Sequence, residues 1–435
     1  MRPIVHNARE DLTPEGTMRI ACVDLLFSWP PHGGADVDLF HVLRGLSNLG
    51  HEVKLFGLST PDAWERGRFE ATALPFPAHH LDLSPRDFHH RRLPARIRGL
   101  VDAFQPDAVL VADGFFMKPY VIAALSDYPV AVRYYAHELA CHRSILRYRD
   151  NAPCPDEYAR TPDVCRKCAL EGLRPLVQNG IVTSWTEEYR AARAFAPGYF
   201  QMQEAALRQA ACAIVSNPGM AAEAAPYFEK VFVVPGGADV TSFKYSQVPQ
   251  RAKEDRKIIL MTGRGEDPAK GASVLLEAGE RLARKRSDFE IHITMPCETP
   301  GPDWFRPLGW LSQKRIRQHY EKSDIVVVPS LWEEPFGLVA VEAMASGRPV
   351  CASRVGGLQD IVKHWETGML FDRADSAALA EVLNTLLDDG ALRLLLGEAG
   401  RRRAEAHYAW PQVLKKYYPP ILSYLESRKG SPACA

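Results

Sequence analysis

The sequence predicts an α/β protein with two parallel-sheet domains that face a cleft, and three observations support this prediction. Short apolar runs without strict alternation, such as residues 19–27, are typical of strands buried on both faces of a parallel sheet. Each such run is followed by a loop and a segment with helical periodicity, which together make a βαβ unit. These units form two series separated by the polar segment 244–256, which indicates two domains joined by a linker.

The individual elements follow from the same patterns. In the first series, a turn-rich loop at 29–34 precedes a helix over 37–49, and Gly50 ends that helix before the next strand. The strands expected there are 19–27, 51–56, 108–111, 131–135, 212–215 and 231–234, with a second helix near 121–125. In the second series we expect strands at 257–262, 290–294, 325–328 and 350–352, and helices at 272–284, 312–321 and 338–345.

The composition narrows the range of functions. The 435 residues include 53 Lys and Arg and 53 Asp and Glu, so the protein lacks the net positive charge that is typical of general nucleic-acid-binding proteins. No run reaches the roughly 18–20 consecutive apolar residues of a membrane-spanning helix. Residues 1–17 form a polar leader without the apolar core of a secretory signal. We therefore expect a cytoplasmic protein that does not bind nucleic acid.

The segment 330–349 contains the strongest functional signal. A strand ends at Pro329 and a helical pattern begins near Gly337, so the loop offers backbone N–H groups that suit a phosphate. Glu334 lies in that loop and Glu342 lies in the helix, and carboxylates accept strong hydrogen bonds from sugar hydroxyls. The pattern favours a nucleotide sugar, with its sugar ring at Glu334 and its ribose at Glu342. The alternative is an ordinary helix with an acidic first turn.

Two further segments contain candidate ligand-binding residues. Arg264 and Lys270 lie in a loop between a strand and a helix, where two cations can bind a diphosphate, although a solvated charged turn also fits. A dinucleotide-binding glycine motif is excluded because Pro268 occupies the position of the third glycine. His137 follows the strand 131–135, at the end where open α/β sheets bind ligands, although a lone histidine is more often structural.

Together these segments resemble a family 4 glycosyltransferase of the GT-B fold, which has two Rossmann-like parallel-sheet domains. The pair Glu334 and Glu342 resembles the Glu-x7-Glu motif of that family, and Arg264 with Lys270 resembles its phosphate-binding pair. Gly236 departs from the pattern, because the family often has asparagine there. The other matching positions, which extend the resemblance over most of the chain after residue 18, are the glycine loop 33–34 and the segments 309–311, 329–330, 355–357 and 367–370.

The resemblance implies a retaining, metal-independent, hexosyltransferase-like enzyme. It would move a sugar from a UDP-, GDP- or ADP-sugar to a hydroxyl acceptor, in the synthesis of a glycan, glycolipid or glycoconjugate. The leaving diphosphate would help to deprotonate the acceptor, so no protein nucleophile is required. The catalytic residues implied are His137, Glu334, Arg264 and Lys270, and the donor-binding residues are Gly33, Gly34, Arg264, Lys270, Glu334, Phe336, Gly337, Leu338 and Glu342.

The resemblance also implies a role for each part of the chain. Residues 18–243 would form an N-terminal acceptor domain with a cysteine-rich insertion at about 138–180, and residues 257–409 would form the nucleotide-sugar-binding domain. Residues 410–435 would form a terminal helix that packs back on the first domain. The alternatives on this scaffold are a sugar-nucleotide epimerase, a phosphorylase and a non-catalytic nucleotide-sugar sensor.

Four of the nine cysteines are clustered, at Cys141, Cys154, Cys165 and Cys168. Four thiolates with one Cys-x2-Cys pair suit a structural zinc ion, with His142 as a replacement for one thiol. An iron–sulfur cluster and four ordinary thiols are the alternatives. No cofactor is expected for catalysis itself, so a zinc ion would serve to fold a loop beside the acceptor site.

The segment 89–98 is basic and leaves two interpretations open. It could contact the anionic inner face of a membrane that bears a lipid-linked acceptor, as a weak peripheral contact. The favoured interpretation is a solvated helix face, and Pro94 interrupts any long helix there.

Overall fold

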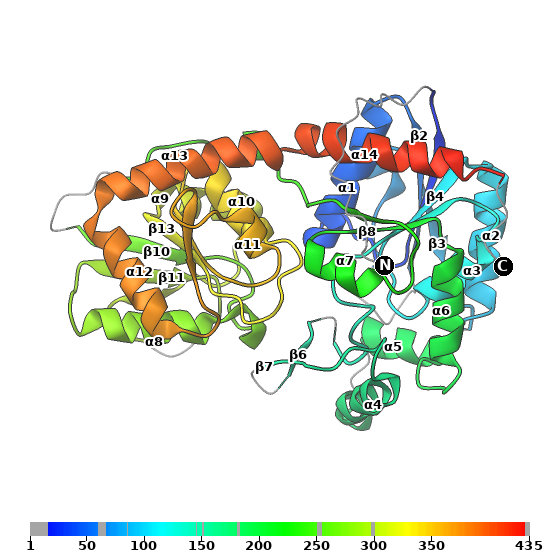
Figure 1. Cartoon of the computed structure of the whole chain (residues 1–435), viewed down its shortest axis with the longest axis horizontal. Helices are drawn as coiled ribbons and strands as arrows, with labels where there is room; N and C mark the ends of the chain where they lie inside the picture. Colours follow the sequence, from blue (N-terminus) through cyan, green and yellow to red (C-terminus); the bar gives the residue numbers. More distant parts are fainter. Residues whose placement is uncertain are drawn as a thin grey trace. The chain divides into compact units, whose positions relative to one another are not determined.

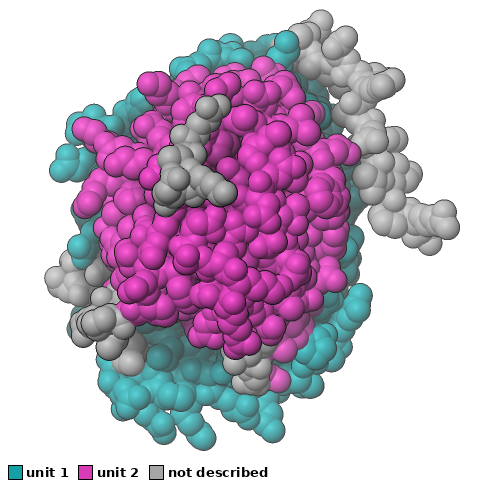
Figure 2. All heavy atoms as spheres, turned by 90° about the vertical axis from the view of Figure 1, so that its left-hand side faces the viewer, with its two compact units in different colours: residues 1–145, 155–234, 413–435 teal, residues 146–154, 235–412 magenta. Residues whose placement is uncertain are grey.

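The chain forms two compact units, which Figure 2 colours separately. Unit 1 comprises residues 1–145, 155–234 and 413–435, and unit 2 comprises residues 146–154 and 235–412. The computed structural model describes residues 16–430 apart from 60–66, 85, 145, 150–151, 181–182, 250–254 and 297–300. Most of the predicted leader 1–17 and the middle of the predicted linker 244–256 therefore lie outside the described residues.

Unit 1 is built on a seven-stranded sheet in which every pair of neighbouring strands is parallel. The strand order is β3-β2-β1-β4-β5-β8-β9. The bounds are β1 Arg19–Asp24, β2 Glu52–Ser59, β3 Ala78–Asp82, β4 Ala108–Val111, β5 Val130–Arg133, β8 Cys212–Val215 and β9 Val231–Val233. Every residue of β4, β5 and β8 is buried, as expected for strands covered on both faces.

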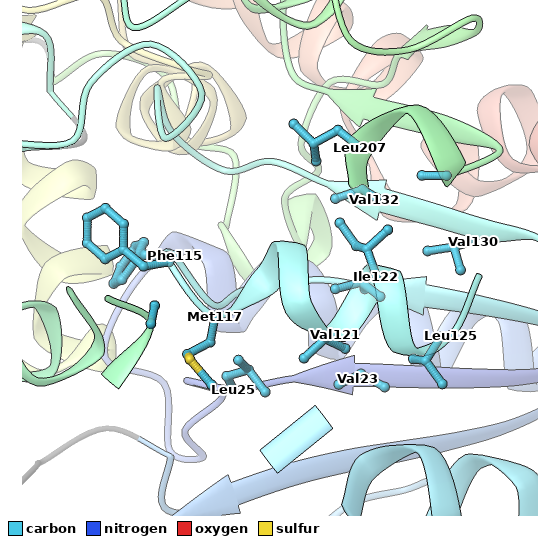
Figure 3. Packing of buried hydrophobic residues seen from close by; sticks show 14 of the residues in the cluster. Val23, Leu25, Phe115, Met117, Val121, Ile122, Leu125, Val130, Val132 and Leu207 are labelled. Atoms are coloured by element: carbon cyan, nitrogen blue, oxygen red, sulfur yellow. The ribbon is translucent and has the colours of Figure 1, made fainter. Parts of the chain in front are cut away.

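Helices cover this sheet, and α3 (Lys118–Ala124) shows how they pack (Figures 1 and 3). Val121 and Ile122 of α3 are fully buried in one apolar cluster with Val23 of β1 and Val130 of β5. The other helices of the unit are α1 Gly34–Asn48, α2 Arg92–Phe104, α4 Pro162–Gln178, α5 Ser184–Ala191, α6 Tyr199–Gln209 and α7 Pro218–Ala224. Within the basic segment 89–98, Arg98 of α2 pairs with Asp102 at 2.8 Å and with Asp127 at 2.9 Å.

Unit 2 contains a six-stranded parallel sheet in the order β12-β11-β10-β13-β14-β15. The strands are β10 Lys257–Met261, β11 Phe289–Ile293, β12 Phe305–Pro307, β13 Ile325–Val328, β14 Val350–Ser353 and β15 Gly368–Phe371. The helices are α8 Ala272–Ala283, α9 Gln313–Lys322, α10 Leu338–Ala345, α11 Leu358–Ile361, α12 Ser376–Asp388 and α13 Gly390–His407.

Both faces of the unit 2 sheet are buried, and the side chains of its central strands alternate between two apolar clusters. Ile259 and Met261 of β10 belong to the cluster that includes α8 and α12, whereas Leu260 belongs to the cluster that includes α10 and α11. This alternation is the two-residue period of a strand. The predicted fold class, two parallel-sheet α/β units, is confirmed.

The sequence patterns did not predict several of the observed elements. The edge strands β3 and β12 are short, and β3 contains two partly exposed histidines, so neither gives an apolar run. A two-stranded antiparallel hairpin, β6 (Tyr148–Arg149) and β7 (Ala152–Pro153), lies in the cysteine-rich segment, and its residues belong to unit 2.

The terminal helix α14 (Trp410–Ser427) extends into unit 1, which includes the chain from residue 413 onwards. Leu414 packs so closely on α1 that a Cβ at Gly45 would lie 2.1 Å from its Cδ1 atom. Lys429, just after the helix, forms an ion pair with Asp107.

Among the described residues, no helix is both long enough and apolar enough to cross a bilayer.

Two other helical glycines offer a matched test of how close packing limits side-chain size in a helix. A Cβ at Gly397 of α13 would lie 2.3 Å from the carbonyl oxygen of Gly347, whereas Gly99 of α2 has open space around the same position. We expect Gly397→Ala to lower the free energy of unfolding by about 1–3 kcal/mol. Gly99→Ala should raise it by about 0.5–1 kcal/mol, because alanine loses less backbone entropy in a helix. Urea unfolding of both variants checks this, and equal effects would contradict it.

Candidate functional site

The side chain of Glu334 is the centre of the candidate site in unit 2. Its two carboxylate oxygens accept hydrogen bonds from Lys270 Nζ at 3.0 and 3.1 Å. Ser330 Oγ donates to the same carboxylate at 2.9 Å and Trp332 Nε1 donates to it at 2.7 Å. A carboxylate has about four acceptor positions. Oε2 accepts three of these four hydrogen bonds and Oε1 accepts one, from Lys270, so donors of the protein itself use most of the acceptor capacity of Glu334.

The backbone explains why Lys270 reaches Glu334. Lys270 ends a short 3-10 turn after β10, and Glu334 lies in the loop after β13, which is the neighbour of β10 in the sheet. Leu331 N–H donates to the carbonyl of Ala269 at 2.8 Å, which joins the turn to the loop. Gly271 has a φ of 77°, and a Cβ there would lie 2.0 Å from the carbonyl oxygen of Pro329. Only glycine permits this close approach.

Arg264, the other predicted phosphate ligand, is not part of this hydrogen-bond network. Its guanidinium is 57% exposed and lies 3.4 Å from the carboxylate of Asp267. Asp267 in turn accepts a hydrogen bond from Ala269 N–H at 3.0 Å, at the start of the turn that carries Lys270. The structure therefore places Arg264 and Lys270 on one loop, but only Lys270 is paired with Glu334.

The loop after β13 ends at the N-terminus of α10. Gly337 precedes the helix with a φ of 110°, and Ala340 N–H donates back to the carbonyl of Gly337 at 2.9 Å. The backbone N–H groups of the residues before Ala340, which include Leu338, thus have no acceptor within the helix. Phe336 packs edge-on against Tyr408, with 5.8 Å between the ring centroids. The predicted residues 336–338 therefore form the segment at the N-terminus of α10.

Glu342 lies in α10 and bonds to a different partner. The buried Tyr320 donates its hydroxyl hydrogen to Glu342 Oε2 at 3.1 Å, and Thr262 lies 2.7 Å from the same hydroxyl. Burial raises the pKa of Glu342 to about 7, although the hydrogen bond from Tyr320 and the charge of Arg317 oppose this rise. Glu342 therefore titrates close to neutral pH.

Several supporting residues were not predicted as part of the site. Ser330 and Trp332 both lie shortly before Glu334 in the sequence. The signals that could have indicated them were this proximity and, for Ser330, the resemblance at 329–330. The adjacent Glu333 accepts a hydrogen bond from Gly356 N–H at 2.8 Å and forms an ion pair with Arg373. The carbonyl of Glu334 accepts from Gly357 N–H at 2.7 Å. The turn after β14 thus holds the loop that contains Glu334.

In unit 1, the predicted glycine loop precedes α1. The carboxylate of Asp36 accepts hydrogen bonds from the N–H groups of Ser28, His32 and Gly33, at 3.0, 2.9 and 3.1 Å. Burial raises the pKa of Asp36. A Cβ at Gly33 or Gly34 would meet no atom within 4 Å among the described residues. Packing inside unit 1 therefore does not require glycine at these positions.

His137 lies in the loop after β5 in unit 1. Its Nδ1 atom lies 2.9 and 3.0 Å from the two carboxylate oxygens of Glu223, a residue that the sequence did not indicate. The next residue, Glu138, forms a buried ion pair with Lys118 at 2.8 Å. Burial raises the pKa of Glu138 to about 7, against the opposing charge of Lys118. His137 therefore contacts the carboxylate of Glu223 and precedes a residue that forms a buried ion pair.

Among the described residues, which include the four clustered cysteines, no three His, Cys, Asp or Glu side chains gather closely enough to hold a metal ion. Cys165 and Cys168 lie one turn apart on α4, and Arg143 Nη1 lies 3.7 Å from Cys168 Sγ. His142, the predicted substitute ligand, stacks on Tyr158 with 3.5 Å between ring centroids. The zinc site stays a prediction.

A small cavity lies next to the Lys118–Glu138 ion pair. Its lining includes His142, Trp185 and Gln203, each with a buried polar atom that lacks a hydrogen-bond partner in the described structure. The centre of a water molecule could occupy only about 10 Å³ inside it. That space corresponds to about one water molecule, so the cavity is too small for a sugar.

Comparisons with known proteins identify the family. The model for glycosyl transferases group 1 matches residues 302–403, and the model for the glycosyl transferase 4-like domain matches residues 33–237. The MMP alpha-(1->4)-mannosyltransferase of Mycolicibacterium hassiacum is 32% identical over 410 residues, which cover 88% of this chain and 92% of that protein. The chain belongs to the family 4 glycosyltransferases.

Another relative and two solved structures show how far the likeness extends. A D-inositol 3-phosphate glycosyltransferase from Arthrobacter sp. is 30% identical over 244 residues, which are 50% of this chain and 57% of that protein. The chain thus spans little more than half of that relative. Sucrose-phosphate synthase from Thermosynechococcus elongatus has a TM-score of 0.62 at 21% identity, covering 94% of this chain and 98% of that chain. Anabaena Alr3699/HepE, solved with UDP and glucose, has a TM-score of 0.61 at 17% identity, covering 93% and 99%. These likenesses establish the GT-B fold.

The raised pKa of Glu342 predicts a pH-dependent change in stability. The folded protein keeps this carboxyl protonated up to about pH 7, whereas the unfolded chain releases the proton near 4.5. The stability that Glu342 contributes is therefore complete below about pH 4.5 and is lost as the pH rises through 7. We expect Glu342→Gln to become more stable relative to wild type between about pH 5 and pH 8, measured by urea unfolding. The exposed Glu277→Gln serves as the control, and a pH-independent difference would contradict the assignment.

Proposed function

We propose that the protein transfers a sugar from a nucleotide-diphosphate sugar to a hydroxyl acceptor, with retention of anomeric configuration and without a catalytic metal. The observation that carries this proposal is the pairing of Lys270 with Glu334 beside the N-terminus of α10. A cation, a carboxylate and the first backbone N–H groups of a helix at one sheet edge match the charges and hydroxyls of a sugar diphosphate. Family membership supports the same chemistry.

In this reaction, the bond between the anomeric carbon and the diphosphate oxygen breaks, and a bond from that carbon to the acceptor oxygen forms on the same face. The acceptor proton passes to the leaving diphosphate, so no protein base is needed to take it up. Because the acceptor oxygen attacks the anomeric carbon directly, no protein nucleophile is needed either. The task of the protein is to stabilise the charge on the diphosphate. Lys270, Arg264 and the start of α10 have the charge and the position to do so. Glu342 would accept hydrogen bonds from the ribose, and His137 would contact the donor sugar.

The hydrogen bonds between Lys270 and Glu334 indicate how the donor would bind. Lys270 occupies two of the four acceptor positions of Glu334. When the diphosphate attracts Lys270, these two positions become available to sugar hydroxyls, while Ser330 and Trp332 still hold the carboxylate. A single movement of Lys270 would thus prepare both the phosphate contact and the sugar contact.

The acceptor proposed is a hydroxyl of a sugar or polyol. Relatives named for D-inositol 3-phosphate and for mannosyl transfer support this class. The location proposed is cytoplasmic. A lipid-linked acceptor, and with it a peripheral contact of the basic segment 89–98 with the inner face of a membrane, stays an alternative. Epimerisation, phosphorolysis and binding without turnover are the other outcomes that the assays below distinguish.

Donor binding can be measured as thermal stabilisation by UDP-, GDP- and ADP-sugars and by the free nucleoside diphosphates. A ligand at 100 times its dissociation constant adds roughly 2.7 kcal/mol to the stability. We expect one nucleotide class to raise the melting temperature of wild type. Glu334→Gln should reduce the shift from the sugar nucleotide more than the shift from the free diphosphate, because it lacks a full acceptor for sugar hydroxyls. The exposed Glu277→Gln should behave as wild type. No shift with any nucleotide would refute the donor assignment.

Turnover with the donor so identified tests the reaction itself. Proton NMR of the first-formed product, recorded with a panel of sugar and polyol acceptors, should show the anomeric configuration of the donor. The rate should be unchanged by EDTA in the assay. An inverted product would overturn retention, a loss of rate with EDTA would overturn metal independence, and release of free sugar phosphate in inorganic phosphate would indicate a phosphorylase.

A structural zinc ion held by Cys141, Cys154, Cys165 and Cys168 is a further proposal, supported by their spacing in the sequence. Elemental analysis of the purified chain should find about one zinc per chain. Replacing both Cys165 and Cys168 by Ser should abolish the metal, whereas the buried Cys351→Ser should keep it. Iron with acid-labile sulfide, or a metal-free folded protein, would contradict the proposal.

A further inference from the structure

The side chains of His137 and Glu223 meet because they follow neighbouring strands. His137 lies in the loop after β5, and Glu223 lies in α7, the helix that follows β8. The strands β5 and β8 pair in parallel, so their carboxyl ends lie at the same edge of the sheet. Asn217 caps α7 by accepting from Met220 N–H at 3.0 Å, which fixes the start of the helix.

The contact between these two residues is short and shielded from water. His137 Nδ1 lies 2.9 Å from one carboxylate oxygen of Glu223 and 3.0 Å from the other. The two side chains are only 3% and 8% exposed. When the Glu223 carboxyl group is ionised, it only accepts hydrogen bonds, and Nδ1 then carries the hydrogen. In a neutral imidazole, this leaves Nε2 without a proton and able to accept a hydrogen bond.

The loop that contains His137 is held at both ends. Lys118 Nζ donates to the carbonyl of Arg133 at 3.1 Å and pairs with Glu138 at 2.8 Å, so one buried cation joins the residues before and after the loop. Tyr134 N–H donates to the carbonyl of Ile214 at 3.0 Å. These contacts hold the loop without Glu223, and the contact that Glu223 makes with this loop is at the imidazole ring of His137.

We propose that Glu223 is a positioning residue for the transfer reaction. It holds His137 with hydrogen on Nδ1, so that Nε2 accepts a hydrogen bond from a hydroxyl group of the sugar substrate. This inference rests on the proposed function, in which His137 contacts the donor sugar. The same two-step arrangement, a carboxylate that orients a histidine whose other nitrogen acts on a ligand, is common where a ring must present one tautomer.

The tautomer can be observed without any activity assay. Full-length protein labelled with nitrogen-15 in its 14 histidines gives ring signals at alkaline pH, where the rings are neutral, and His137→Gln identifies the signal of His137. Wild type should show hydrogen on Nδ1. Glu223→Gln should move the ring towards hydrogen on Nε2, because the amide can donate as well as accept. An unchanged tautomer in Glu223→Gln would overturn the proposal.

Kinetics with the identified donor and acceptor then connect the tautomer to turnover. We expect Glu223→Gln to lower kcat by roughly 10- to 100-fold with a small change in melting temperature, as for other residues that orient a functional histidine. Glu223→Asp, which keeps the carboxylate, should restore both hydrogen on Nδ1 and part of kcat. The exposed Glu229→Gln should behave as wild type.

The outcomes separate this inference from the proposed function. A shifted tautomer with unchanged kcat would overturn the positioning role while leaving glycosyl transfer intact. A loss of kcat in Glu223→Asp equal to that in Glu223→Gln, with hydrogen retained on Nδ1, would also overturn it. If no donor or acceptor supports turnover, the proposed function fails, and the NMR result still shows whether Glu223 sets the tautomer.

Discussion

The contact between the turn after β10 and the loop after β13 is the constraint on which the candidate site depends. Gly271 lets the turn approach Pro329 more closely than any side chain would allow, and the backbone hydrogen bond from Leu331 to Ala269 joins the two segments. Lys270 reaches Glu334 only because these segments touch. A shift of the turn would leave the carboxylate with the donors of its own loop, and its negative charge would be uncompensated.

Unit 1 follows the same geometric rule with different chemistry. In both sheets, neighbouring parallel strands direct their loops to one edge, so residues far apart in the sequence become neighbours. In unit 2 this pairs a cation with a carboxylate that accepts four hydrogen bonds from three side chains, and in unit 1 it pairs a histidine with Glu223. Both pairs form within a single unit, so neither depends on how the two units are arranged.

The sequence predicted the architecture because buried parallel strands leave a clear pattern of apolar runs. It also placed Glu334, Lys270 and His137 in loops at strand ends, since that placement is local. It could not predict that Lys270 pairs with Glu334 or that His137 meets Glu223, because these contacts span 64 and 86 residues and depend on strand order. Short edge strands such as β3 escaped prediction because they have too few apolar residues to form a run.

The pairing of Lys270 with Glu334 has a consequence for the affinity of the site for a sugar diphosphate. An empty anion site with a free lysine would have to keep a partly buried cation unpaired, which is costly. Glu334 removes that cost by accepting two hydrogen bonds from Lys270. A diphosphate carries more negative charge than one carboxylate and can attract Lys270 away, but a neutral sugar cannot. In the proposed function, binding of the sugar to Glu334 would therefore depend on the phosphate of the same molecule, and this coupling would select an activated sugar over a free one.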